Sequence, residues 1–318
     1  MTSLKCSIVV RAFNEEKHLG RLFTGLDQQS IRDIEVILVD SGSTDRTVEI
    51  ATSNEWNFPV RVVQIEPERF SFGRSLNYGI RQASSEIIVI ASAHIFPVYP
   101  DWLEKLIQPF SDSQVGLTYG KQRGGAPTHF SEHQIFSRWY PEQPQIQATN
   151  PFCNNANAAI RRSLWNEHPY DETLTGLEDL EWAHWAIETD SVISYVAEAE
   201  IIHIHEASPN GIYNRYKREA MAFKRIFPEE KFGLWDFIRF FTRNVLSDFS
   251  QAWRQDTLMR EIINIQWFRF MQFWGTYQGY RKSGPLTSEL RQTFYYPDAK
   301  QAGQQSIRRD VKPIRYHE

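Results

Sequence analysis

The stretch Cys6-Ser-Ile-Val-Val-Arg-Ala-Phe-Asn-Glu-Glu16, continued through Ile34-Glu-Val-Ile-Leu-Val-Asp-Ser-Gly-Ser-Thr-Asp-Arg-Thr47, decides the fold. Each half opens with a short apolar run, which is typical of a buried strand. Between the runs, apolar residues recur at three- and four-residue spacing from Leu19 to Leu26, which predicts a helix. A strand, a crossover helix and a second strand form a parallel unit, and ligands bind outside the carboxyl ends of such strands. Asp40 stands at one of these ends.

The alternation of strands and helices continues along the chain and predicts an α/β fold, with a mostly parallel, Rossmann-like central sheet and flanking helices. The pattern weakens over residues 120–155, where we expect a loop or a partly helical insert. The further strands are expected at 60–65, 86–91, 115–119, 157–160, 192–196 and 201–204, and helices begin near residues 45, 71, 100 and 178.

Beyond residue 210 the pattern changes to long helices that are rich in aromatic and basic residues. Residues 1–211 hold 16 Lys and Arg against 28 Asp and Glu, whereas residues 212–318 hold 19 against 11. This excess of positive charge indicates an anionic neighbour, such as a membrane surface, a lipid diphosphate or nucleic acid. No nucleic-acid recognition motif accompanies it. We therefore expect residues 211–318 to form a helical extension, with a strap or tail over 292–318.

The apolar residues from Leu234 to Trp253 fall on one face of a predicted helix, with arginines around it. A helix packed on the α/β body and an interfacial membrane helix both fit this pattern. With 318 residues and 41% apolar content the chain can bury a full core, but no apolar run approaches the length of a membrane span. The start has no secretory signal pattern, so the expected location is cytoplasmic, with peripheral attachment at the inner face of the membrane. The oligomeric state is left open.

Five motifs occur in an order that resembles the family 2 glycosyltransferases. They are Ser7-Ile-Val-Val-Arg-Ala-Phe-Asn-Glu-Glu16, Val39-Asp-Ser-Gly-Ser-Thr-Asp-Arg-Thr47, Ser92-Ala-His94, Gly176-Leu-Glu-Asp-Leu-Glu-Trp182 and Ile202-His-Ile-His205. The resemblance covers roughly residues 5–210 and implies a GT-A fold. It implies a nucleotide-sugar-binding half over residues 1–100 and an acceptor-binding half over 101–210.

The resemblance also implies the residues that bind the nucleotide sugar. In similar enzymes an aspartate at the position of Asp40 contacts the nucleobase, although Asp40 would also suit a helix cap. Arg74 and Asn77 stand near a helix start, where they would face a diphosphate, although an exposed arginine on an ordinary helix explains Arg74 as well. The full expected set is Arg11, Asn14, Glu15, Asp40, Ser41, Arg74, Asn77, Ser92, Ala93 and His94.

Ser92-Ala-His94 departs from the family pattern, which has Asp-x-Asp here to hold a divalent cation. Serine does not restore the lost charge, and a neutral imidazole suits Mn²⁺ or softer ions better than Mg²⁺. His203 and His205 lie two residues apart on a predicted strand, so they point to the same face. Either the three histidines His94, His203 and His205 complete a metal site, or cationic side chains neutralise the diphosphate without metal.

Glu178 and Asp179 open a predicted helix, where acidic residues are favoured by the helix dipole whatever their function. The resemblance implies that Asp179 removes the proton from the acceptor hydroxyl. We expect the helix N-terminus to lower the pKa of this carboxyl, which would keep it ionised.

The implied reaction is an inverting transfer of a hexosyl or deoxyhexosyl group from a nucleoside-diphosphate sugar to a glycan or lipid-linked sugar acceptor, in cell-surface polysaccharide synthesis. It requires Asp40, His94 and Asp179 to converge on one cleft. The alternative is a non-catalytic nucleotide-sugar binder with a degenerate metal site. A sugar nucleotidyltransferase would need a glycine-rich loop after the first strand, and Arg11-Ala-Phe-Asn-Glu-Glu16 contains no glycine.

Overall fold

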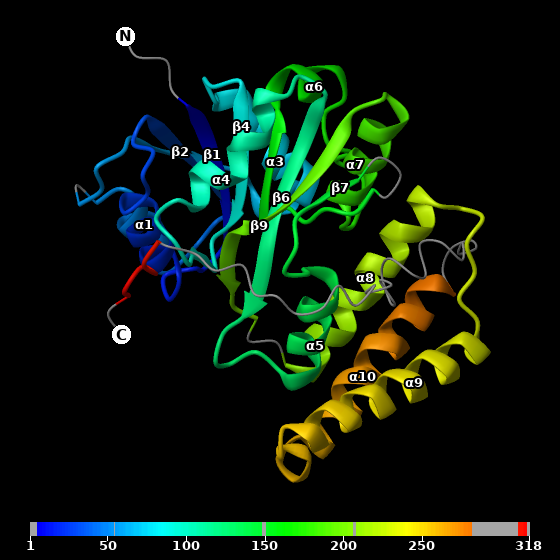
Figure 1. Cartoon of the computed structure of the whole chain (residues 1–318). Coiled ribbons are helices and arrows are strands. Elements are labelled where there is room, and N and C mark those ends of the chain that lie inside the picture. Colours follow the sequence, from blue (N-terminus) through cyan, green and yellow to red (C-terminus); the bar gives the residue numbers. More distant parts are fainter. Residues whose placement is uncertain (1–4, 54, 148–150, 206–207, 282–310, 317–318) are drawn as a thin grey trace.

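The computed structural model describes residues 5–53, 55–147, 151–205, 208–281 and 311–316, and it confirms the α/β fold expected from the sequence (Figure 1). The first part of the sheet is parallel, with the strand order β3-β2-β1-β4. Its elements are β1 (Cys6–Ala12), α1 (Leu19–Asp27), β2 (Ile34–Asp40), α2 (Thr47–Ala51), β3 (Val60–Gln64), the short turn η1 (Pro67–Arg69), α3 (Phe72–Gln82) and β4 (Ile87–Ser92).

The second part of the sheet is mixed. Strand β8 pairs antiparallel with β4 and β6, β9 runs parallel to β6, and the short strands β5 and β7 pair antiparallel with β9. The elements here are β5 (Ile95–Pro97), α4 (Trp102–Ile107), η2 (Gln108–Ser111), β6 (Val115–Gly124), α5 (Phe130–Trp139), β7 (Gln145–Gln147), β8 (Asn157–Arg161), α6 (Arg162–Glu167), α7 (Glu178–Glu188) and β9 (Val192–His203).

The two strands expected at 192–196 and 201–204 are one continuous strand, β9, so that prediction is wrong. Within this strand, Glu198 and Glu200 alternate with the buried alanines 197 and 199. A charged residue at every second position fits the pleat of a strand, because successive side chains point to opposite faces. The insert expected at 120–155 contains the end of β6 together with α5 and β7.

Strand β1 shows why helices cover both faces of the sheet. Ile8 and Val10 join an apolar cluster that includes residues of α1 and α4, whereas Val9 joins a second cluster that includes residues of α3 and α7. An unbroken apolar run is what a strand buried on both sides requires. The polar groups at the strand ends are then the ones left to face a ligand.

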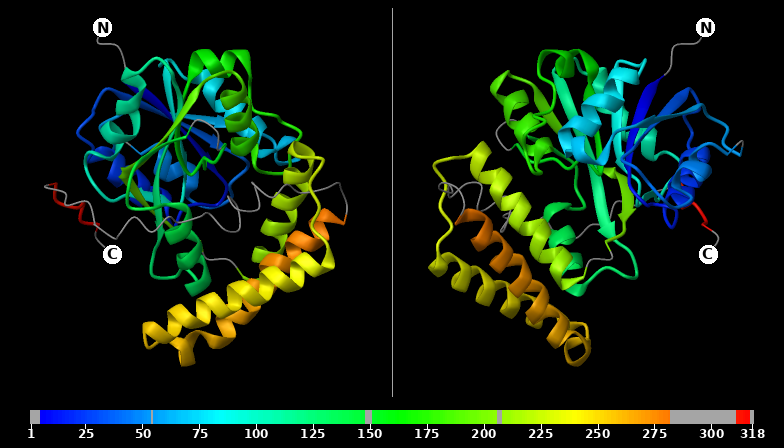
Figure 2. Two further views of the ribbon diagram at one scale, coloured as in Figure 1. Left: turned by 45° about the vertical axis from the view of Figure 1, so that its right-hand side comes forward. Right: turned by 180° about the vertical axis from the view of Figure 1, so that it is seen from behind.

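Three long helices follow the sheet: α8 (Pro209–Ile226), α9 (Leu234–Arg254) and α10 (Leu258–Tyr280). Helix α10 lies very close to α8, because a Cβ atom at Gly275 or Gly279 would stand 2.5 Å from a backbone oxygen of α8. Figures 1 and 2 show α9 and α10 as a hairpin that extends away from the sheet. The expected helical extension is thus confirmed over residues 209–280.

Most of the tail expected at 292–318 lies outside the described residues. Within the described segment 311–316, the Ile314 amide donates a hydrogen bond to the Val98 carbonyl oxygen at 2.9 Å. Among the helices that the structure describes, none combines the length and the apolar character needed to cross a bilayer.

A buried ion pair joins α9 to α10. Arg269 donates from Nε and Nη2 to the two carboxylate oxygens of Asp248, at 2.7 and 3.0 Å, and the two side chains are 1% and 0% exposed. The same guanidinium donates to Gln272 at 2.8 Å and to the backbone oxygen of Ser131 in α5 at 3.3 Å. Arg269 therefore fixes the hairpin to the helix that borders the sheet.

We expect Asp248→Ala to lower the free energy of unfolding by about 3–5 kcal/mol, because it leaves a buried guanidinium without its carboxylate. Urea unfolding followed by circular dichroism measures the change. Asp33→Ala, at an exposed site, is the matched control and should change the value by less than about 0.5 kcal/mol. The double variant Asp248→Leu/Arg269→Met should recover most of the loss. Equal effects of Asp248→Ala and Asp33→Ala would contradict this account.

Candidate functional site

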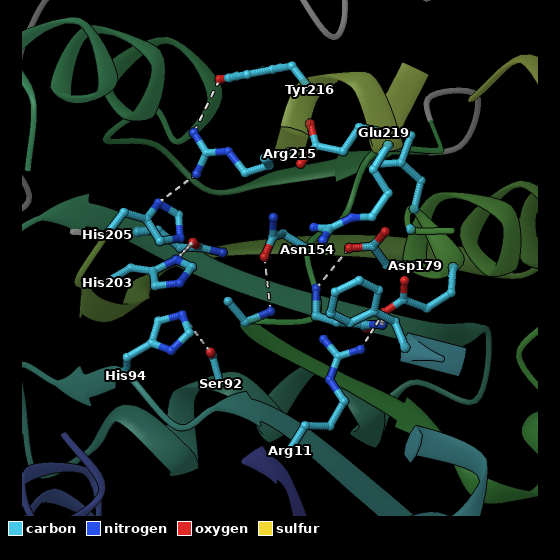
Figure 3. Close-up of a pocket in the computed structure, with 18 of the residues that line it drawn as sticks. Arg11, Ser92, His94, Asn154, Asp179, His203, His205, Arg215, Tyr216 and Glu219 are labelled. Carbon is cyan, nitrogen blue, oxygen red and sulfur yellow. Dashed lines mark hydrogen bonds and ion pairs between the residues drawn. The ribbon is translucent and has the colours of Figure 1, made fainter. Parts of the chain in front are cut away.

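A cavity of about 410 Å³ lies beside the ends of β1, β4 and β9, and α5, α7 and α8 close its other sides (Figure 3). Nine of the residues expected from the sequence line it, namely Arg11, Glu15, Ser41, Ser92, His94, Glu178, Asp179, His203 and His205. The three histidines lie toward one end of the cavity and Asp179 toward the other. Of the three residues expected to converge on one cleft, His94 and Asp179 line this cavity and Asp40 does not.

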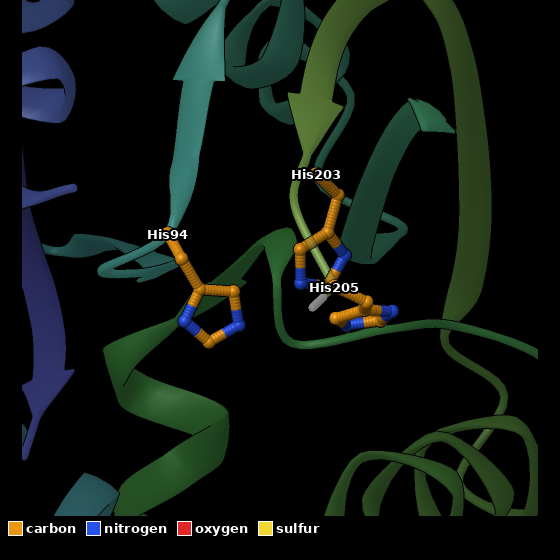
Figure 4. Close-up of side chains that lie close together, drawn as sticks. All are labelled: His94, His203 and His205. Carbon is orange, nitrogen blue, oxygen red and sulfur yellow. The ribbon is translucent and has the colours of Figure 1, made fainter. Parts of the chain in front are cut away.

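The three histidines gather at one point, although His94 follows β4, His203 ends β9 and His205 lies two residues beyond it (Figure 4). One ligand nitrogen from each ring lies within 4.8 Å of the others. The alternation of β9 places His203 and His205 on the same side, and the antiparallel pairing of Ile95 with His203 brings the His94 loop alongside. The chain fold thus assembles three imidazoles from two separate segments.

Each imidazole is held through its Nδ1 atom by a side chain that offers an oxygen. Nδ1 lies 2.8 Å from Glu15 Oε1 in His94, from Gln122 Oε1 in His203 and from Glu132 Oε1 in His205. These oxygens accept hydrogen bonds, so we assign the ring proton to Nδ1 in His94 and His203. Nδ1 of His205 also lies 3.0 Å from Nη1 of Arg215, which can only donate, so Glu132 and Arg215 make opposite demands on this nitrogen. The assignment leaves Nε2 of His203 available to a ligand, whereas Nε2 of His94 lies 3.0 Å from Ser92 Oγ.

This pattern fits a divalent metal ion. Histidines that bind metals commonly donate the other ring N–H to a carboxylate or carbonyl, which fixes the ring and its tautomer. Nε2 of His203 is buried and has no hydrogen-bond partner in the described part of the chain. Burial, together with the repulsion that a protonated His203 would meet from Arg215 and from a protonated His205 or His94, holds the pKa of His203 well below its usual value. His203 is therefore neutral, as a metal ligand must be.

A buried carboxylate holds the helical extension to this cluster. Glu132 of α5 accepts hydrogen bonds from His205 and, at 2.7 Å, from Arg215 of α8. Burial alone would raise the pKa of Glu132, but Arg215 and His205 outweigh it, and the pKa lies well below its usual range. Glu132 is thus ionised and orients both of its partners.

Asp179 lies at the start of α7, where the Asn155 and Leu180 amides donate to its carboxylate at 3.1 and 2.9 Å. Burial and the neighbouring charge of Glu178 nevertheless raise the pKa of Asp179 to about 7. The expectation that the helix N-terminus would lower this pKa is therefore wrong, because two opposing effects outweigh the backbone amides and Arg11. A carboxylate with a pKa near 7 is suited to take a proton at neutral pH.

Two arginines from distant segments lie over one aromatic ring. The guanidinium carbons of Arg11 and Arg218 lie 4.7 and 4.5 Å from the centre of the Phe72 ring. Arg11 also pairs with Glu178 at 2.9 Å, and burial lowers the pKa of Arg218. Together with Arg215 they give the cavity three cationic side chains, which suits an anionic ligand.

The polar side chains at the turn after β2 form hydrogen bonds within the turn and with the loop after β1. Asp40 is 1% exposed, and its carboxylate accepts hydrogen bonds from the Gly42 and Ser43 amides at 3.2 Å. Asn14 accepts from the Thr44 amide at 2.8 Å, which ties the loop after β1 to this turn. Neither residue lines the cavity, and Ser41 is the part of the turn that does. A contact between Asp40 and a nucleobase stays a prediction.

Arg74 and Asn77 serve a different purpose from the one expected. Asn77 fills all four of its hydrogen-bonding positions with Trp165, Tyr170 and Glu172. Arg74 Nε lies 2.7 Å from Glu172 Oε2. Their side chains fasten α3 to residues 165–172 and lie outside the cavity lining, so the structure does not support their expected contact with a diphosphate. Ala93 is fully buried and also lies outside the lining.

The contribution of α5 and α8 to the cavity was not predicted from the sequence. Glu132, Arg215, Tyr216, Arg218 and Glu219 all line the cavity. Arg215 and Arg218 are three residues apart in a helix, which places them on one face. That spacing was a signal of a cationic surface, but nothing local to it reveals that α8 faces the sheet.

The fold is shared with solved glycosyltransferases. The structure is similar to that of a mannosyltransferase from Pyrobaculum calidifontis in complex with GDP-Man and Mn²⁺, with a TM-score of 0.59 and 18% identity, over 88% of this chain and 85% of that one. The fold therefore defines a protein of the GT-A class. Residues 7–168 match the model of glycosyl transferase family 2, and the chain belongs to that family.

Two sequence relatives are similar over more than half of the chain. An O-antigen chain rhamnosyltransferase of Salmonella typhimurium is 24% identical over 226 residues, which are 67% of this chain and 70% of the relative. A second O-antigen chain rhamnosyltransferase, from Salmonella anatum, is 27% identical over 208 residues, 61% of this chain and 64% of the relative.

If the histidine cluster binds a cation, His203→Ala should abolish measurable Mn²⁺ binding. Gln122→Leu should weaken it by about tenfold to a hundredfold, because the His203 ring loses the oxygen that orients it. Titration with Mn²⁺ followed by electron paramagnetic resonance measures the free ion. His184→Ala is the matched control, because His184 lies outside the cavity lining with its Nε2 atom 3.7 Å from Glu188. Equal affinities of the His203 and His184 variants would rule out this site.

Proposed function

We propose that this protein transfers a hexosyl or deoxyhexosyl group from a nucleoside-diphosphate sugar to a hydroxyl of a glycan or lipid-linked sugar acceptor, with inversion at the anomeric carbon. The observation that carries the proposal is the position of Asp179, whose pKa is about 7, in the cavity that also holds the histidine cluster and three arginines. The names of the two rhamnosyltransferase relatives support a role in cell-surface polysaccharide synthesis.

Asp179 acts as the general base. Its carboxylate accepts the proton of the acceptor hydroxyl while the hydroxyl oxygen attacks the anomeric carbon, and the bond from that carbon to the diphosphate oxygen breaks. The attack comes from the face opposite the diphosphate, which inverts the configuration. The Asn155 and Leu180 amides hold the carboxylate in place throughout.

Cationic side chains stabilise the departing nucleoside diphosphate. Arg215 and Arg218 of α8 and Arg11 of β1 border the cavity, and fixed charges in a largely buried site stabilise developing negative charge better than water does. A divalent cation on the Nε2 atoms of His94, His203 and His205 would add positive charge at the same diphosphate. The presence of Mn²⁺ with GDP-Man in the Pyrobaculum calidifontis complex supports this expectation.

The choice of metal follows from the ligands. Three imidazoles without a carboxylate favour Mn²⁺ over Mg²⁺, because Mg²⁺ prefers oxygen ligands in octahedral geometry. Ser92, whose Oγ lies 3.0 Å from His94 Nε2, supplies no negative charge. We therefore propose a site that works with Mn²⁺ and poorly with Mg²⁺.

Asp179→Asn should reduce turnover by about a hundredfold to ten-thousandfold, because the amide accepts no proton from the acceptor. Release of nucleoside diphosphate from donors with uracil, thymine or guanine bases, with Mn²⁺ and an acceptor present, measures it. Glu188→Gln, exposed at the far end of the same helix, should retain full activity. A non-catalytic nucleotide-sugar binder would bind a donor and show no turnover in the unmodified protein, which would refute the proposal.

The activity should depend on pH through Asp179. Only the ionised base is active, so kcat/KM should rise with pH up to about 7 and level off above it. Glu178→Gln should move this inflection to lower pH, because it removes a negative charge that raises the pKa of Asp179. Rate measurements at saturating Mn²⁺ on both sides of neutral pH show both effects. If Glu178→Gln does not change the pH of the inflection, the inflection belongs to a group other than Asp179.

A further inference from the structure

The large apolar side chains that are exposed in the described residues gather on the α9–α10 hairpin. Phe13 and Phe70 line the cavity, and Tyr78 is the other one outside the hairpin. The remaining eight belong to the hairpin: Leu234, Trp235, Ile238, Leu246, Trp253, Met259, Ile263 and Phe270. Such a concentration marks an interaction surface, since exposed apolar residues are otherwise scattered singly.

Helical geometry aligns these residues in two rows. Trp235, Leu246 and Trp253 are spaced by 11 and 7 residues, which at about 100° per residue places them within about 20° of one another. Met259, Ile263 and Phe270 on α10 are spaced by 4 and 7 residues and fall within about 40°. Trp235 and Trp253 are 74% and 71% exposed, so the row on α9 has an exposed tryptophan at each end.

Aromatic contacts pack α9 against α10. Phe237 and Phe241 of α9 pack edge to face on Phe270 of α10, with ring centres 5.9 and 6.1 Å apart. Phe237 and Phe241 lie about 200° and 240° around the helix from Trp235, so the tryptophan row of α9 points away from α10. Figure 2 shows that the hairpin projects from the rest of the molecule, which leaves room for a broad partner.

The charges along α9 are unequal. Arg239, Arg243 and Arg254 are exposed. The two acidic residues of α9 are engaged elsewhere, since Asp236 accepts from the Gly233 amide at the helix start and Asp248 is buried against Arg269. Arg239 lies about 40° from the row of tryptophans, so positive charge borders the apolar surface.

We propose that the α9–α10 hairpin docks on an anionic lipid bilayer, with its apolar face in the interfacial layer and its arginines at the lipid head groups. An apolar face bordered by arginine, with tryptophan at its ends, is the composition of helices that lie in a membrane interface. Anionic lipids complement the arginines. A second copy of this chain fits less well, because a two-fold interface would bring the same arginine-bordered faces together.

The docking surface is physically connected to the cavity. Helix α10 packs on α8 through Gly275 and Gly279, and α8 supplies Arg215 and Arg218 to the cavity. Docking would thus hold the cavity near the membrane, where a lipid-linked acceptor would meet it. Only this last step rests on the proposed function, and the binding of the hairpin to lipid does not.

Flotation of the full chain with vesicles of phosphatidylcholine, with and without phosphatidylglycerol, tests the proposal. The unmodified protein should float with the anionic vesicles. Trp235→Ser/Trp253→Ser should lower the partition coefficient by about tenfold or more. Arg239→Gln/Arg243→Gln should lower it by about fivefold for each arginine on anionic vesicles and leave binding to neutral vesicles unchanged.

Matched variants on the α/β body are the controls. Tyr78→Ser and Arg46→Gln/Arg61→Gln remove exposed residues of the same kinds and should bind like the unmodified protein. Absence of binding to anionic vesicles, or equal binding by the tryptophan variant and Tyr78→Ser, overturns the proposal. Sedimentation velocity tests the alternative that a second copy of this chain covers the hairpin. A dimer that the tryptophan variant dissociates, without vesicle binding, would make this face an interface between copies.

Discussion

The buried carboxylate of Glu132 is the interaction on which the site depends. It comes from α5, and it accepts hydrogen bonds from His205 at the end of the sheet and from Arg215 of α8. Its side chain is 3% exposed, so an ionised carboxylate persists there only because both partners are present. One side chain thereby orients a metal-ligand candidate, holds an arginine at the cavity and fixes the helical extension to the α/β body.

Two carboxyl groups that line the same cavity have pKa values shifted in opposite directions, with that of Glu132 lowered and that of Asp179 raised. Glu132 faces Arg215 and His205, which hold its pKa below its usual range against the effect of burial. Asp179 is buried beside Glu178, which raises its pKa to about 7. Two carboxyl groups with such different pKa values are suited to different roles. The one with the low pKa stays charged and can orient its neighbours, whereas the one with a pKa near 7 can exchange a proton at neutral pH. The charge distribution therefore favours Asp179 over Glu132 as the proposed base.

The local sequence pattern predicted the fold and the position of the cavity residues that lie at the ends of strands. The apolar runs located β1, β2 and β4, and the strand-end rule then placed Arg11, Ser92 and His94 at the cavity. The two-residue spacing of His203 and His205 predicted their shared face. These inferences succeeded because each depends on a periodicity that a few neighbouring residues define.

The predictions that failed depend on partners far away in the sequence. Asn77 is hydrogen-bonded by residues near 170. The contact of Glu132 with Arg215, about which no prediction was made, likewise spans 83 residues. The pKa of Asp179 is raised, although its position at a helix N-terminus predicted that it would be lowered. Burial causes the rise, and burial depends on tertiary packing that the local sequence does not define. The division of the α/β body into donor and acceptor halves remains a prediction. No pattern within α8 shows that it would close the cavity.

The central claim is that one cavity holds a cation on three histidines and the donor diphosphate beside Asp179. Pulsed electron paramagnetic resonance of Mn²⁺ bound to the protein with a nucleoside-diphosphate sugar tests it most directly. The account predicts magnetic couplings to histidine nitrogen and to the phosphorus of the diphosphate in the same Mn²⁺ signal. Phosphorus couplings without histidine nitrogen, or a bound Mn²⁺ that senses no phosphorus, would contradict it.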